Sequence, residues 1–202
     1  MQDRLQAMLD KCEIAEVVQT ERAARDQAQW TRMLDTYHPD SVVDLSWFFG
    51  SGPEFVAASQ RLFEAGRQSA HQMGPTLVTL RGDRALAHTP CAVAVRTRLD
   101  GVEVDVTTHS RLHERMERRD GAWRIARMGI VYLRDGMTVV NPCERVEIDA
   151  AMLATYRPTY RFLSYLLAQA GQQPRLDLPG IDRPETVRPL LDRDEAWLAG
   201  IG

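Results

Sequence analysis

The spacing of hydrophobic residues changes once within the first 135 residues of the chain. Up to Gly66 the apolar side chains recur every three or four residues, which predicts helices. From Ser69 onward they alternate with polar side chains, which predicts strands. We therefore expect three helices and a short strand over residues 10–66, followed by a curved antiparallel sheet over residues 69–133.

Capping and helix-breaking residues mark the ends of the first two predicted helices. Asp10 and Glu13 have the spacing of a capping box, which places the start of the first helix at Asp10. The second helix carries Trp30 and Tyr37 at the two ends of its apolar face. We expect it to end before Pro39, because the residue that precedes a proline avoids the helical conformation.

Turn residues define the elements that follow. A short strand is expected over residues 41–47, and a third helix should begin at the Ser-Gly-Pro-Glu sequence of residues 51–54, because proline suits the first helical position. The Asp-Gly pairs at residues 100–101 and 120–121 are hairpin turns. They join long antiparallel strands, the last of which is predicted over residues 123–133.

The last part of the chain, residues 146–202, differs in pattern from the predicted barrel domain of residues 1–145. Asp149 can cap a helix that runs to about Gln169 with an interruption at Pro158. Beyond it, a proline-containing arm should end in a short helix over residues 191–198. The arm either packs on the barrel or a neighbouring subunit, or it is a loosely ordered tail.

Length and composition fit a globular protein with one main domain. The chain has 202 residues, 44% of them hydrophobic, and a net charge of −3. It has no apolar run long enough to span a membrane, and residues 1–11 do not have the pattern of a signal peptide. We therefore expect a cytoplasmic protein that binds no membrane.

The basic residues and the cysteines narrow the function classes further. Lys11 is the only lysine, and this bias toward arginine suggests a GC-rich, bacterial genome. The arginines are scattered in a chain of negative net charge, so we expect no nucleic-acid partner. The three cysteines, Cys12, Cys91 and Cys143, are too widely spaced to indicate a disulfide framework or a metal knuckle.

No metal or cofactor site is predicted. The sequence contains no phosphate-binding loop, dinucleotide fingerprint, nucleophile elbow or zincin motif. His109 and His113 are four residues apart, but on a strand this spacing separates them by about 13 Å, too far to share one ion. His88 is expected to be structural, and His38 is expected to be exposed in a loop.

Three segments resemble the SnoaL-like branch of the nuclear-transport-factor-2-like superfamily. They are residues 14–45 (IAEVVQTERAARDQAQWTRMLDTYHPDSVVDL), 69–87 (SAHQMGPTLVTLRGDRALA) and 110–132 (SRLHERMERRDGAWRIARMGIVY). The resemblance implies a cone-shaped, cystatin-like α+β barrel in which a curved antiparallel sheet wraps around N-terminal helices. That fold hosts dehydratases, isomerases, cyclases, dehydrochlorinases and non-enzymatic binders, so the function must be inferred from the site.

The resemblance points to Asp26 and His71 as a catalytic pair, in positions similar to the dyad of scytalone dehydratase and hexachlorocyclohexane dehydrochlorinase. A neutral histidine can accept a proton near neutral pH, and a carboxylate on its other ring nitrogen fixes the tautomer. The pair could then remove a proton next to a carbonyl group while a leaving group departs. The alternative is that Asp26 caps the second helix and that His71 is an ordinary core residue.

The sequence also departs from the family pattern. Glu21 stands where family enzymes often have a tyrosine that polarises the substrate carbonyl, and residues 91–95 lack the second histidine of scytalone dehydratase. Leu45 stands where ketosteroid isomerases place their aspartate base, which disfavours that isomerase chemistry.

Four further residues are candidates for substrate contact. The resemblance makes Ser110 a pocket serine, and Tyr37 and Tyr132 are possible hydrogen-bond donors. Trp47 belongs to an aromatic cluster that could line an apolar pocket or form plain core.

Together these observations predict a cofactor-independent, dehydratase-like lyase for a small hydrophobic cyclic substrate. The alternatives are a non-catalytic ligand- or partner-binding module and the structural small subunit of an aromatic-ring dioxygenase. The uncharged strand residues Thr89, Ala92, Val93 and Ala94 also suggest a homodimer or homotrimer that pairs through the convex face of the sheet.

Overall fold

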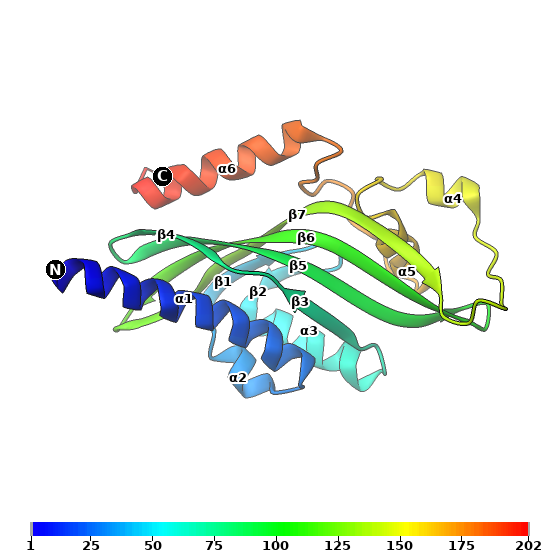
Figure 1. The fold of residues 1–202 in the computed structure, drawn as a ribbon, viewed down its shortest axis with the longest axis horizontal. Coiled ribbons are helices and arrows are strands. Elements are labelled where there is room, and N and C mark those ends of the chain that lie inside the picture. Colours follow the sequence, from blue (N-terminus) through cyan, green and yellow to red (C-terminus); the bar gives the residue numbers. More distant parts are fainter. Residues whose placement is uncertain (1, 202) are drawn as a thin grey trace.

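The computed structural model describes residues 2–201, which form one curved sheet with helices on both of its faces (Figure 1). The helices within this range are α1 (Gln2–Asp26), α2 (Trp30–Leu34), α3 (Gly52–Glu64), α4 (Ala150–Ala154), α5 (Arg161–Gln169) and α6 (Pro184–Ala199). The strands are β1 (Tyr37–Asp44), β2 (Phe49–Ser51), β3 (Ser69–Met73), β4 (Leu77–Arg81), β5 (Arg84–Leu99), β6 (Val102–Arg119) and β7 (Ala122–Val139). None of these helices is long and apolar enough to cross a membrane.

The sheet has the strand order β2-β1-β7-β6-β5-β3, and β4 pairs with β5 beside β3. All pairs are antiparallel except β1 with β7, which run parallel. The β6–β7 ladder shifts register between His109 and Ser110 and again between Arg115 and Met116. Such bulges bend long strands, so they help to curve the sheet. The expected α+β fold, with a curved sheet around N-terminal helices, is confirmed.

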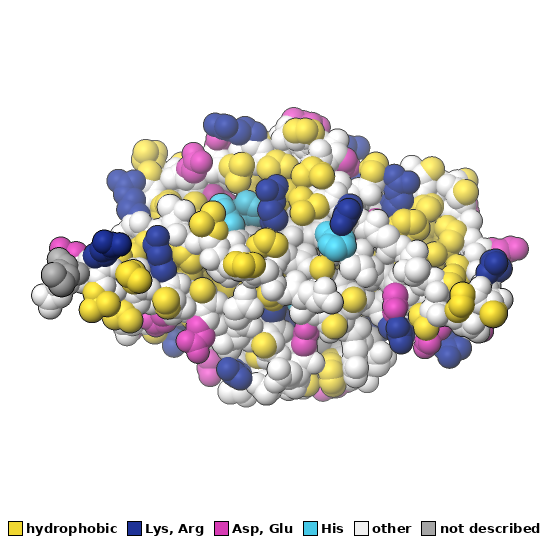
Figure 2. All heavy atoms as spheres, viewed as in Figure 1, with side chains coloured by type: hydrophobic (Ala, Val, Ile, Leu, Met, Phe, Trp, Pro, Cys, Tyr) yellow, Lys and Arg dark blue, Asp and Glu magenta, His cyan; other side chains and the backbone are white. Residues whose placement is uncertain are grey.

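The helices form two layers, which Figure 1 shows on opposite sides of the sheet. The helices α1, α2 and α3 lie against its concave face, where Ile14 and Val18 of α1 and Phe55 of α3 are fully buried. The helix α6 lies on the other face. The same view as spheres shows acidic, basic and hydrophobic side chains interspersed over the face that is turned toward the viewer (Figure 2).

The first helix begins at Gln2, so the predicted start at Asp10 is wrong. Asp10 does not cap the helix, because it lies in its middle and is 4% exposed. Its Oδ1 accepts hydrogen bonds from Arg118 Nη1 at 2.8 Å and from Trp123 Nε1 at 3.3 Å. Asp10 therefore fastens α1 to β6 and β7 beside the hairpin turn that joins them.

The second helix is shorter than predicted and ends at Leu34. Tyr37 belongs to β1, where it pairs with Ile125 of β7, so sheet pairing overrides the apolar helical spacing. His38, which was expected to be exposed, is 2% exposed. Its Nε2 lies 3.0 Å from the carbonyl oxygen of Glu117 and donates to it.

The third helix and the hairpins follow the predictions more closely. Ser51 and Glu54 form a reciprocal capping box at the start of α3. Asp100 and Asp120 adopt positive φ values of 49° and 52° in the two predicted hairpin turns. The last strand continues to Val139, beyond the predicted end at residue 133, because β6 is long enough to pair with it over that length.

The C-terminal arm packs on the barrel within the described residues. Asp149 caps α4 by accepting from the backbone N–H of Met152, as predicted. The final helix spans 16 residues, so the predicted residues 191–198 are only its second half. Arg157 binds Asp182 with two hydrogen bonds of 2.6 and 3.0 Å, which joins the two parts of the arm.

Fewer residues lie on the sheet face expected to mediate self-association than the sequence indicated. Thr89 is fully buried and bonds to Thr76, and Val93 lines the cavity described below. Ala92 and Ala94 remain half-buried on the outer face. The homodimer or homotrimer stays a prediction.

The position of Asp10 gives a test of the first helix. Replacing Asp10 with alanine should lower the free energy of unfolding by about 1.5–3 kcal/mol, because two charge-assisted or buried hydrogen bonds are lost. The replacement of the exposed Glu16 on the same helix with alanine is the matched control and should change stability by less than about 0.5 kcal/mol. Urea denaturation of both variants measures the difference, and equal losses would contradict the role of Asp10.

Candidate functional site

A cavity of about 320 Å³ lies between the concave face of the sheet, the end of α1, α3 and α5. Arg25 and His71 line it on one side, and Ser110 and Tyr132 line it on the sheet. Apolar side chains make up most of the remaining wall: Leu45, Trp47, Leu62, Val93, Val95, Leu112, Ile130, Leu163, Leu166 and Leu167. The cavity therefore combines an apolar wall with polar and charged side chains, among them Arg22, Arg67, Arg96 and Arg98, as small-molecule sites can do.

Asp26 contacts His71, which is the member of the pair that lines this cavity. Asp26 is the last residue of α1, and His71 is the middle residue of β3. Asp26 Oδ1 lies 2.6 Å from His71 Nδ1, and Asp26 Oδ2 accepts the backbone N–H of His71 at 2.7 Å. The alternative role for Asp26, a cap for the second helix, does not occur, because Gln29 is the N-cap residue of α2.

Arg25 occupies the other ring nitrogen of His71. The guanidinium Nη1 of Arg25 lies 3.0 Å from His71 Nε2. A guanidinium can only donate, so Nε2 must be the unprotonated nitrogen. The proton of the neutral ring then resides on Nδ1 and is donated to Asp26. The two neighbours of His71 thus fix its tautomer from both sides.

The same arginine has further partners that hold it beside the dyad. Arg25 donates to the hydroxyl oxygens of Ser59 at 3.2 Å and Ser69 at 2.9 Å. Its guanidinium lies 5.6 Å from the ring centre of Trp47, which is within cation–π range. Burial lowers the pKa of Arg25 to about 10, so the side chain is still a cation at neutral pH.

Burial also controls the protonation of the dyad. Burial lowers the pKa of His71 to about 4, against the hydrogen bond of Asp26, while Arg22 and Arg25 lower it further. Burial acts to raise the pKa of Asp26, but the hydrogen bonds from His71 outweigh it and the pKa falls below its usual value. At neutral pH the pair is therefore a neutral imidazole bound to a carboxylate.

Behind the cavity, Glu21 forms a buried polar cluster in the core. Glu21 is fully buried, forms an ion pair with Arg22 and accepts the hydroxyl of Tyr37 at 2.7 Å. Tyr37 is therefore engaged in the core and does not line the cavity. The carboxyl of Glu114 is buried nearby, and burial together with the charge of Glu21 raises its pKa to about 8.

The other three candidate contact residues do line the cavity, but two of them already have hydrogen-bond partners. Ser110 donates to the carbonyl oxygen of Cys91 at 3.1 Å. Tyr132 donates to Ser46 Oγ at 2.8 Å. Trp47 packs against Phe55 with ring centres 5.4 Å apart, so it contributes apolar wall.

The sequence reasoning missed two parts of the site. Arg25 precedes Asp26 directly in the sequence, but on a helix adjacent residues point in different directions, so their joint contact with His71 could not be foreseen. Leu163, Leu166 and Leu167 of α5 cover the cavity. Their helical spacing was a usable signal for an apolar face that must pack on something.

Comparison with known proteins agrees with this fold. Residues 6–129 match the SnoaL-like domain family, and the chain belongs to that family. Pea pathogenicity protein 2 of Fusarium vanettenii is 28% identical over 199 residues, which cover 95% of this chain and 84% of that protein. An uncharacterised protein of Emericella nidulans is 26% identical over 182 residues, 86% of this chain and 76% of that protein. Both relatives are fungal, which counts against the bacterial source suggested by the arginine bias.

Solved structures show the same fold at low identity. A hexachlorocyclohexane dehydrochlorinase of Novosphingobium barchaimii is 15% identical with a TM-score of 0.57, over 72% of this chain and 99% of that one. A candidate scytalone dehydratase of Novosphingobium aromaticivorans is 16% identical with a TM-score of 0.53, over 73% of this chain and 100% of that one. At such identities the likeness concerns the fold alone.

The low pKa of His71 predicts a loss of stability in mild acid. His71 remains neutral in the folded protein down to about pH 4, whereas in the unfolded chain it takes up a proton near pH 6.5. The unfolded state binds more protons between these values, so the free energy of unfolding falls as pH is lowered from 6.5 to 4, by on the order of 3 kcal/mol for this group.

Replacing His71 with glutamine removes this titration and should flatten the pH dependence within the same window. Chemical denaturation in steps of about half a pH unit between pH 7 and pH 4 measures how the free energy of unfolding changes with pH. A slope that is identical in wild type and His71→Gln would contradict a neutral, buried His71.

Proposed function

We propose that the protein is a cofactor-independent lyase of the dehydratase type, in which His71 is the general base and Asp26 its orienting partner. The observation that supports this most is the Asp26–His71 pair, whose histidine lines a largely apolar cavity. The carboxylate fixes the ring with Nε2 unprotonated, which is the form that can accept a proton.

The proposed reaction is an elimination next to a carbonyl group. Substrate displaces the Arg25 guanidinium from His71 Nε2, and Nε2 takes the proton from the carbon beside the carbonyl. The electrons of that C–H bond form the new C=C bond as the C–O bond to the hydroxyl group breaks. The imidazolium then returns the proton to the departing hydroxide, so that water leaves and neutral His71 is restored.

Arg25 has a second role in this scheme. Once it is displaced from Nε2, its guanidinium can donate to the substrate carbonyl oxygen, on which negative charge builds up during proton removal. It is a suitable donor because it stays charged at neutral pH and is held near the dyad by Ser59 and Ser69. The position taken by a tyrosine in family enzymes is occupied here by Glu21, so Arg25 supplies the oxyanion contact.

The cavity wall suggests the class of substrate. A cavity of about 320 Å³ with leucine, valine and tryptophan walls suits a small cyclic molecule with few polar groups. Structural neighbours described as a hexachlorocyclohexane dehydrochlorinase and a candidate scytalone dehydratase support an elimination from a ring.

A second candidate is a ligand-binding module without catalysis. The observation in its favour is that Arg25 already occupies His71 Nε2 in the structure. In such a protein the guanidinium would hold an oxygen of the ligand and His71 would stay neutral throughout. The third reading, a structural dioxygenase subunit, calls for a filled barrel, and the cavity counts against it.

Proton removal can be tested without knowledge of the natural substrate. Cyclic β-hydroxy ketones are incubated with the protein in D₂O, and proton NMR follows both deuterium uptake beside the carbonyl and elimination of the hydroxyl group. Wild type should catalyse at least the exchange. His71→Ala should reduce the rate by about 10²–10⁴-fold, because the general base is lost. Asp26→Asn should also reduce it strongly, because the other tautomer is favoured.

One control and one further site variant sharpen this test. The control, His109→Ala on the outer face of β6, should retain the wild-type rate. Arg25→Gln should lower the rate, because the oxyanion contact is lost, and should shift its acid limb from near pH 4 to higher pH, because one of the two cations that lower the pKa of His71 is removed. Saturable ligand binding with no exchange in any variant would support the binding module in place of the lyase.

A further inference from the structure

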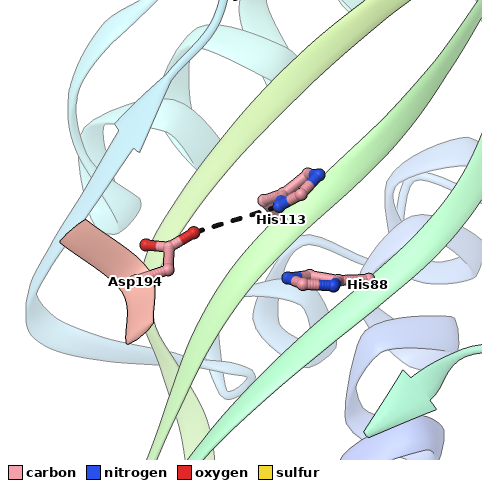
Figure 3. Close-up of side chains that lie close together, drawn as sticks. All are labelled: His88, His113 and Asp194. Atoms are coloured by element: carbon pink, nitrogen blue, oxygen red, sulfur yellow. Dashed lines mark ion pairs between the residues drawn. The ribbon is translucent and has the colours of Figure 1, made fainter. Parts of the chain in front are cut away.

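A cluster of three side chains lies outside the cavity, between the outer face of the sheet and α6. His88 of β5 and His113 of β6 are direct cross-strand partners, so their side chains leave the sheet on the same face. Asp194 of α6 reaches toward them from the helix that covers this face, as Figure 3 shows. Three elements that are distant in the sequence thus bring two imidazoles and a carboxylate together.

The donor atoms are close but do not bind one another. One ligand atom from each of the three residues lies within 4.8 Å of the other two. His113 Nδ1 is 3.9 Å from Asp194 Oδ2, which is too long for a hydrogen bond. Asp194 Oδ1 is occupied by Arg115 Nε at 2.8 Å, so Oδ2 is the oxygen that remains available.

The two histidines lack partners for their buried nitrogens. Both ring nitrogens of His113, and Nε2 of His88, are buried with no hydrogen-bond partner among residues 2–201. His113 is only 6% exposed and Asp194 only 3% exposed. Buried polar atoms in proteins are nearly always bonded to something, so this group of unpaired ring nitrogens, in which each neutral imidazole has one lone pair to offer, calls for a ligand.

We propose that His88, His113 and Asp194 form a binding site for a divalent transition-metal ion of the zinc class. Two imidazole nitrogens and one carboxylate oxygen are a common zinc donor set and leave a fourth position for water. Coordination at about 2.0–2.1 Å places donors about 3.3 Å apart, so donor atoms that now lie within 4.8 Å of one another need to approach by at most about 1.5 Å.

A metal at this site would fix α6 to the barrel. The helix is otherwise held there by Arg84, which donates to the carbonyl oxygen of Trp197 at 2.8 Å, and by the Arg115–Asp194 ion pair. Arg115 orients the carboxylate as an outer partner, and its positive charge, with that of Arg111, weakens cation binding. The site is therefore a clamp on the arm, remote from the cavity.

Zinc binding is tested with untagged full-length protein that has been stripped with a chelator and dialysed. Calorimetry with Zn²⁺ should show one ion bound per chain, and Co²⁺ should give the visible absorption of a protein-bound ion. Zinc at about a hundredfold excess over its dissociation constant should raise Tm by about 5 °C or more. His88→Gln and Asp194→Asn should each weaken binding by about tenfold or more and abolish most of the Tm shift.

His88→Gln is the more informative variant, because His88 is only half-buried and its loss should not disturb the fold; circular dichroism of the metal-free variant checks this. The matched controls are His109→Gln, on β6 with His113, and His71→Gln at the cavity, and both should bind zinc as wild type does. The proposal is overturned if zinc does not bind stoichiometrically, if binding survives both His88→Gln and Asp194→Asn, or if it is lost in either control. These outcomes leave the proton-exchange test of the cavity unaffected.

Discussion

The carboxylate of Asp26 is the contact on which the arrangement of the site depends. One of its oxygens accepts the ring N–H of His71, and the other accepts the backbone N–H of the same residue. Since β3 is the last strand in the sheet order and pairs only with β5, that backbone N–H has no strand to bind on its free side. Asp26 therefore gives this backbone N–H at the sheet edge a hydrogen-bond partner and also orients the imidazole. The same contacts fasten the end of α1 to the sheet.

This double attachment has a chemical consequence for the cavity. With Nδ1–H committed to Asp26, the unprotonated Nε2 faces Arg25 and the cavity wall, in an environment too buried to favour an imidazolium. The site thus holds an unprotonated ring nitrogen beside a cation, and in the proposed reaction the displacement of Arg25 by substrate frees that nitrogen and lets the cation follow the charge created on the substrate. The leucines of α5 close the cavity over these groups, so the C-terminal arm is part of the site.

The order of helices and strands could be predicted because local signals and tertiary structure agree there. Capping residues at Ser51 and Asp149 and the Asp-Gly hairpins act within a few residues, and each of them appears in the structure. The predictions were wrong where a distant partner decides. Asp10 looks like a cap until Arg118 and Trp123 are placed beside it, and Tyr37 has helical spacing until β7 pairs with it.

The candidate site likewise contains some residues that the sequence could indicate and others that only the tertiary structure brings together. Asp26 and His71 could be chosen from family resemblance, and the structure brings them together. Trp47, Ser110 and Tyr132 line the cavity, while Tyr37 is held in the core by Glu21. The contact of Arg25 with His71, by contrast, could not be predicted, because it depends on how the end of α1 faces β3. The pairing of His88 with His113 depends on the β5–β6 register. The sequence alone offered only His109 as a possible partner for His113, and the strand spacing excluded it.

The central claim is that His71 is a neutral imidazole that carries its proton on Nδ1, bound between Asp26 and Arg25. Nitrogen-15 NMR of ring-labelled protein reads both the tautomer and the titration of each histidine, and His71→Gln assigns the signal. The structure predicts that His71 is in the Nδ1–H form at neutral pH and becomes protonated only near pH 4. A His71 that carries its proton on Nε2, or that titrates near its ordinary value of about 6.5, would contradict the proposed base and its orientation.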